Sequence, residues 1–72
     1  MPQKRRNKRI QVRVLAERDS SGYSISVYDR AGLLAKTSCL RKSNVATTAT
    51  LAASTALGVP EGRIMISPLE YA

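Results

Sequence analysis

Residues 10–40 decide the fold and read IQVRVLAERDSSGYSISVYDRAGLLAKTSCL. Apolar and polar side chains alternate from the start of this stretch, with Ile10, Val12 and Val14 on one side of the pattern, which is typical of a half-buried strand. Clusters of turn-forming residues at 19–22 and 29–32 divide the stretch into three such segments. Three short strands separated by tight turns predict an antiparallel meander.

A helix is predicted over residues 45–57, directly after the third strand. Ser43 or Asn44 is expected to cap its start and Gly58 its end, with Pro60 stopping it two residues later. The apolar residues on its broad face are Val45, Ala46, Ala49, Ala52, Ala53, Ala56 and Leu57. The helix carries no charged residue. We therefore expect it to be stable only when packed against the sheet.

Residues 63–66 predict a fourth strand that ends before Pro68. The expected fold is a small α+β domain with the element order β-β-β-α-β. Its three- to four-stranded antiparallel sheet carries one helix, from the C-terminal half of the chain, on one face. We assign residues 9–72 to this single domain and residues 1–8 to a flexible basic arm.

Positive charge is concentrated at the start of the chain. The 72 residues include 12 Lys and Arg and 5 Asp and Glu, which gives a net charge of +7. Five of the 12 basic residues lie in the arm or directly after it: Lys4, Arg5, Arg6, Lys8 and Arg9. Basic N-terminal arms usually bind polyanions, most often DNA or RNA. The alternative interpretation is a solvated, solubilising tail.

Two further groups of basic residues are candidates for the same kind of contact. Arg41 and Lys42 precede the predicted helix, whose free backbone N–H groups bind anions. Arg13 and Lys36 are expected on the exposed face of the sheet. The polar and aromatic residues expected beside them are Gln11, Ser24, Ser26, Tyr28 and Ser38. The alternatives are a solvated strand–helix connection and a solvated sheet face.

Catalysis, metal binding and cofactor binding are not expected. The chain has no His and one Cys, Cys39. It therefore lacks a nucleophile–base pair, a zinc ligand set and an intramolecular disulfide. We find no paired carboxylates and no Gly-rich phosphate loop. No apolar run is long enough to cross a bilayer or to form a signal-peptide core, so we expect a cytoplasmic protein without a membrane partner.

Two resemblances point toward nucleic acid. VYDRAG at 27–32, followed by RKSNVATTATLAA at 41–53, resembles the hairpin, basic connection and Ala-rich helix of some RNA-binding ribosomal proteins. This resemblance implies a basic helix entry close to phosphate. Three antiparallel strands followed by a helix, with a basic N-terminal segment, also look like the arm-type DNA-binding domains of phage integrases. That second resemblance implies a sheet that enters the major groove.

The sequence therefore predicts a small, non-enzymatic nucleic-acid-binding protein with a regulatory or accessory role, of phage or plasmid type. The alternative is a small basic module that inhibits or adapts a larger, acidic host protein. The C-terminal residues that could anchor such a partner are Ile64, Met65, Ile66, Leu69 and Tyr71. A homodimer is compatible with both hypotheses, because a terminal strand leaves a sheet edge to be covered.

Overall fold

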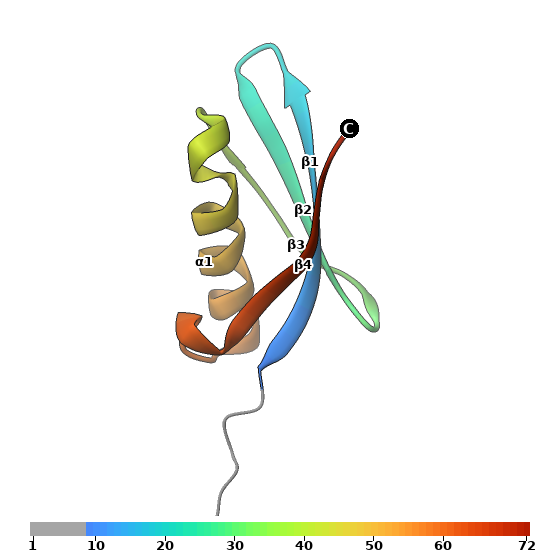
Figure 1. Cartoon of the computed structure of the whole chain (residues 1–72), viewed down its shortest axis with the longest axis vertical. Coiled ribbons are helices and arrows are strands. Elements are labelled where there is room, and N and C mark those ends of the chain that lie inside the picture. The colour runs from blue at the N-terminus through green and yellow to red at the C-terminus, as the bar shows by residue number, and fades with distance from the viewer. Residues whose placement is uncertain (1–8) are drawn as a thin grey trace, which may run out of the picture.

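The computed structural model describes residues 9–72, so the predicted arm, residues 1–8, lies outside the described residues. The elements are β1 (Ile10–Asp19), β2 (Gly22–Asp29), β3 (Gly32–Cys39), α1 (Val45–Leu57) and β4 (Ile64–Tyr71). Short 3₁₀ turns, η1 (Lys42–Asn44) and η2 (Glu61–Arg63), flank α1. The helix packs on one face of a four-stranded sheet (Figure 1). The predicted α+β class and β-β-β-α-β order are confirmed.

The sheet has the strand order β3-β2-β1-β4. β1 pairs with β2, and β2 with β3, in antiparallel fashion, which confirms the predicted meander. β4 pairs in parallel with β1, so the complete sheet is mixed rather than wholly antiparallel. The reason is the helical crossover, because α1 returns the chain to the end of the sheet where β3 began. β4 therefore runs in the same direction as β3 and β1.

β4 continues through Pro68, where the sequence predicted its end. Val12 pairs with Ile66 and Val14 pairs with Leu69, so Ser67 and Pro68 together lie opposite one residue of β1. A proline is compatible with this strand because β4 is at the edge of the sheet that residues 9–72 form, where it pairs with β1 alone. The residues after Pro68, from Leu69 to Tyr71, are therefore still part of β4.

The core lies between α1 and the central strands. Its fully buried side chains are Val12, Val14, Ala16, Ile25, Val27, Val45, Ala49 and Ala53. The buried helix residues are Val45, Ala49 and Ala53, whereas Ala46 and Ala56 are exposed. The buried face of the helix is thus narrower than predicted. Two alanines at its centre allow the helix backbone to approach the sheet closely.

The sequence predicted the C-terminal end of α1 better than its N-terminal end. Gly58 adopts a left-handed conformation with φ of 67° and donates its N–H to Ser54 O at 2.9 Å, as expected for a C-terminal cap. At the other end, Asn44 makes no side-chain capping bond. Turn η1 precedes the helix instead, with Asn44 N–H donating to Arg41 O at 3.0 Å. Asn44 therefore occupies the predicted N-cap position, but the expected side-chain capping bond does not form.

A register shift at the start of β3 determines which of its two leucines, Leu33 or Leu34, faces the core. Val27 pairs with Ala35 and Tyr28 pairs with Leu33, which leaves Leu34 as the extra residue of a bulge. Leu34 packs against the core, whereas Leu33 is 56% exposed. Simple alternation along β3 would place Leu33 and Ala35 on the same face. The bulge changes this because two residues of β3 share one position of β2.

Candidate nucleic-acid interface

The face of the sheet opposite α1, called here the open face, carries the predicted polar residues. The register places Arg13 beside Tyr28, Ser26 beside Lys36 and Ser24 beside Ser38. Their neighbours in the chain, Val14, Val27 and Ile25, are buried on the helix side. Since side chains alternate across a strand, the polar residues project away from the helix.

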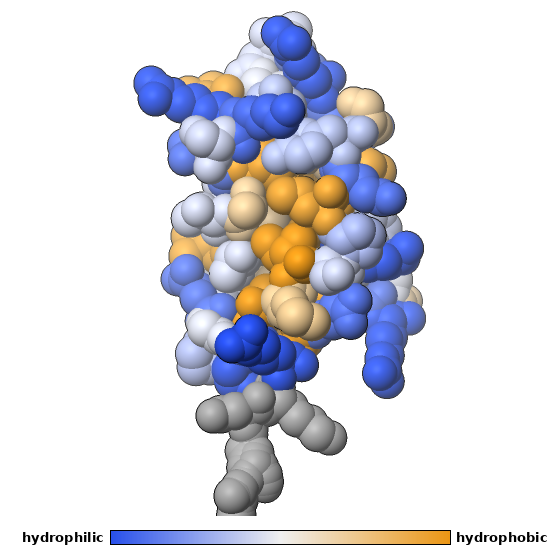
Figure 2. Space-filling view, in the orientation of Figure 1, coloured by the Kyte–Doolittle hydropathy of each residue, from blue (hydrophilic) through white to orange (hydrophobic). Residues whose placement is uncertain are grey.

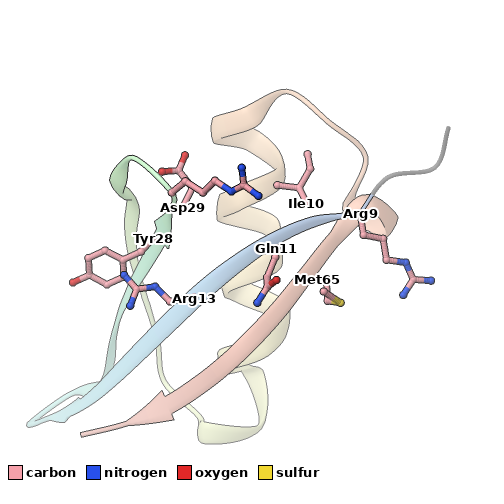
Figure 3. A pocket seen from close by; sticks show the side chains of 8 residues that line it. Arg9, Ile10, Gln11, Arg13, Tyr28, Asp29 and Met65 are labelled. Carbon is pink, nitrogen blue, oxygen red and sulfur yellow. The ribbon is translucent and has the colours of Figure 1, made fainter. Parts of the chain in front are cut away.

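Arg13 and Tyr28 line one side of a hollow on the open face (Figure 3). The Arg13 guanidinium carbon lies 5.5 Å from the centroid of the Tyr28 ring, within the range of a cation–π interaction. The hollow has a volume of about 470 Å³. The residues that line it are Arg9, Ile10, Gln11, Arg13, Tyr28, Asp29, Arg30 and Met65. Three arginines and one aspartate make the lining positively charged (Figure 3).

Arg9 connects this hollow to the predicted arm. It projects from the start of β1, on the far side of Met65 from Arg13 (Figure 3). Lys8 is covalently joined to Arg9, so the arm enters the domain beside the hollow. The other arm residues assigned to nucleic acid, Lys4, Arg5 and Arg6, lie with Lys8 outside the described residues.

Arg30 is a residue of the hollow that sequence reasoning missed. It lies in the turn between β2 and β3, which brings it to the same end of the sheet as the start of β1. Within this turn, the Asp29 carboxylate accepts a hydrogen bond from Ala31 N–H at 2.8 Å. The sequence held one indication of this role, because Arg30 is only two residues after Tyr28, which had already been assigned to the open face.

Gln11 has a structural role on the open face. Its side-chain amide Nε2 donates to the backbone oxygen of Ser67 at 3.0 Å. This bond ties β1 to the register shift of β4, where Pro68 has no N–H to offer.

Lys36 lies on the open face beside Ser26 but does not line the hollow.

Arg41 and Lys42 lie at the other end of the sheet. They line a separate depression with Arg18 and the turn between β1 and β2. Lys42 Nζ lies 4.7 Å from the Tyr71 ring centroid, and Tyr71 packs edge-on against Tyr23 at 6.3 Å. β1 has 10 residues, and a strand of that length spans roughly 30 Å. The structure therefore separates the predicted basic residues into two groups.

The chemistry available in the described residues is anion binding and aromatic contact. Residues 9–72 contain no group of three His, Cys, Asp or Glu side chains placed to hold a metal ion. Cys39 is half-buried, and its thiol donates to Arg41 O at 3.1 Å. Within the same range, no helix has the length and apolar character to cross a membrane.

Comparison with known proteins adds no relative, since no protein-family model, curated protein or solved structure matches this chain.

Proposed function

We propose that the protein binds nucleic acid, without catalysing a reaction on it, through the hollow of the open face and the basic arm. The observation that carries this proposal is the gathering of Arg9, Arg13 and Arg30 around one hollow beside Tyr28. Arginine is suited to phosphate because its planar guanidinium donates two parallel hydrogen bonds. One carboxylate among the lining residues, Asp29, leaves the hollow with an excess of positive charge.

The arm extends the same charge along the chain. Lys4, Arg5, Arg6 and Lys8 add four positive charges directly before Arg9. Each phosphate they neutralise releases counterions, so the logarithm of the binding constant falls linearly with the logarithm of salt concentration. Together with the arginines of the hollow, they would give a slope of roughly −3 to −6. Tyr28 offers a ring on which one base can stack, with Arg13 beside it.

The proposed biological role is that of a small regulatory or accessory factor, of the kind that phages and plasmids encode. Phosphate contacts supply its affinity, and Lys36 on the same face adds a further cation. Arg41 and Lys42 form a secondary contact region at the other end of the sheet. We place this activity in the cytoplasm, where the single cysteine, Cys39, stays a free thiol.

Fluorescence anisotropy tests the proposal directly. Labelled duplex DNA, single-stranded DNA and RNA are titrated with nuclease-treated protein at about 50 and 200 mM salt. We expect micromolar or tighter binding to at least one probe at the lower salt, and a loss of about tenfold or more at the higher salt. Failure of all three probes to bind at the lower salt would reject the proposal and favour the alternative of an acidic host protein.

A further inference from the structure

One helix does not cover the whole inner face of the sheet. Val12, Val14 and Ala16 of β1 are fully buried beneath it, whereas Ile64, Ile66 and Leu69 of the neighbouring β4 are only half-buried, although they face the same side. Four residues of β4 face the same side of the sheet as α1: Ile64, Ile66, Leu69 and Tyr71. We call these four residues the apolar strip.

The apolar strip is part of a continuous apolar surface. Figure 2 shows this surface running lengthwise between α1 and β4, with hydrophilic residues on both sides. Charged residues are absent from the 13 positions of α1 and from Ile64 to Leu69 of β4, whereas at the far end of the strip Glu70 precedes Tyr71 and Lys42 lies over the Tyr71 ring. In a chain of net charge +7, the stretch from Ile64 to Leu69 is therefore a surface where a second copy meets no like charge in direct contact.

The order of residues in β4 makes the apolar strip self-complementary. The register shift at Ser67–Pro68 puts Ile64 and Ile66 before it, and Leu69 and Tyr71 after it, on the same face. An antiparallel copy of β4, related by a two-fold axis near Ser67, would place Ile66 against Leu69 of the other copy. The same axis would place Ile64 against the other Tyr71. Such a closed two-fold contact uses the same patch of both copies.

The arrangement also keeps like charges of the two β4 strands apart. On the open face, the same axis places Met65 of one copy opposite Glu70 of the other copy. The uncharged side chain of Met65 is therefore the one that faces this carboxylate. The same register keeps Glu70 of one copy away from Glu70 of the other, because the two lie on opposite sides of the axis. The other sheet edge, β3, carries the exposed cation Lys36, and two copies of that edge would bring like charges together.

We infer that the protein forms a two-fold homodimer through the apolar strip, with β4 of the two copies antiparallel. Pro68 cannot donate a hydrogen bond at the centre, so side-chain packing and the strand segments on either side of Pro68 hold the copies together. The two-fold axis is perpendicular to the sheet, so both open faces lie on the same side of the dimer. The two hollows then belong to one extended basic surface.

Measurement of the mass in solution tests the dimer independently of nucleic-acid binding. Analytical ultracentrifugation of nuclease-treated protein should give a mass near twice the 7.8 kDa monomer, at about 100 μM protein. The substitution Met65→Glu would place a carboxylate opposite Glu70 of the other copy. The repulsion between these like charges should dissociate the dimer, so the measured mass should be that of the monomer. Met65→Lys, at the same exposed position, should keep the dimer. A monomer mass for the wild type, or equal masses for the two variants, would overturn the inference.

Cross-linking locates the interface without disturbing the apolar strip. In a Cys39→Ser background, Ser67→Cys places one thiol per copy beside the two-fold axis, within the reach of a disulfide. We expect this variant to form a covalent dimer under mild oxidation. Ser20→Cys, exposed in the turn between β1 and β2, is the matched control and should stay monomeric on a non-reducing gel. A dimer in which Ser67→Cys cross-links no better than Ser20→Cys would overturn the inference, because another face would then join the copies.

Discussion

Arg13 of β1 and Tyr28 of β2 are direct cross-strand partners, and the Arg13 guanidinium carbon lies 5.5 Å from the centre of the Tyr28 ring. A charged donor and an aromatic ring thus lie together on the open face. The ring restrains the long arginine side chain, so less conformational entropy is lost when that side chain binds a phosphate. The pair also lines the hollow that Arg9, the first described residue, borders.

Replacement of Arg13 by Gln should weaken nucleic-acid binding and reduce the magnitude of the salt slope by about 1, the value expected for one lost phosphate contact. The measurement is anisotropy at a series of salt concentrations. Arg18→Gln is the comparison variant, because it removes the same charge at the other end of the same strand, beside the secondary contact region of Arg41 and Lys42, and it should cause a smaller loss of affinity. Equal losses in the two variants would show that total charge, rather than the hollow, determines binding.

Removal of the Tyr28 ring should weaken binding more than removal of its hydroxyl group. Tyr28→Ala abolishes both the stacking surface and the contact with Arg13, and we expect a loss of about 1–3 kcal/mol in binding free energy. Tyr28→Phe keeps the ring and should bind nearly as well as the wild type. Thermal unfolding followed by circular dichroism verifies that both variants are folded. Equal affinities for Ala and Phe would exclude a role for stacking.

Gly22→Ala should destabilise the hairpin between β1 and β2. A Cβ atom added to Gly22 would clash with the Cys39 backbone oxygen, and the residue has a φ of +148°. Both the contact and the backbone conformation disfavour a side chain, so we expect a loss of roughly 2 kcal/mol or more in the free energy of unfolding. Gly62→Ala, where an added Cβ meets nothing within 4 Å, is the control and should have little effect. Urea denaturation measures both.

Truncation of the central core residue should cost more than truncation at the surface of the helix. Ile25 is 0% exposed, and Ile25→Ala should reduce the free energy of unfolding by about 2–5 kcal/mol. Leu51 is 51% exposed, so Leu51→Ala should cost well under 1 kcal/mol. In a domain of this size the first change removes much of the stability. Similar midpoints in urea would contradict the assigned core.

The sequence predicted the elements well where local patterns decide them. Alternation of apolar residues found the three strands of the meander, and Gly58 with Pro60 found the end of α1. Tertiary geometry decided the remainder. The direction of β4 depends on the helical crossover, and the reversal of Leu33 and Leu34 depends on a bulge that shifts the register of β3 against β2.

The candidate site was only partly predictable for the same reason. Placement of Arg13 and Tyr28 on one face follows from the alternation within each strand, but their direct pairing depends on the register of the hairpin. Arg30 joins the hollow because a turn returns it to the start of β1. Arg41 and Lys42 were assigned to the same ligand because of their charge and their place before the helix, but the length of β1 separates them from the hollow.

The central claim is that nucleic acid binds at the hollow of the open face. Backbone amide shifts of ¹⁵N-labelled protein, recorded with the tightest-binding probe, test this claim most directly. We predict that the largest shifts occur at the start of β1, at the end of β2 and in the turn that contains Arg30. Shifts that are confined to α1, to β4 after Pro68, or to the depression of Arg41 and Lys42 would contradict the account.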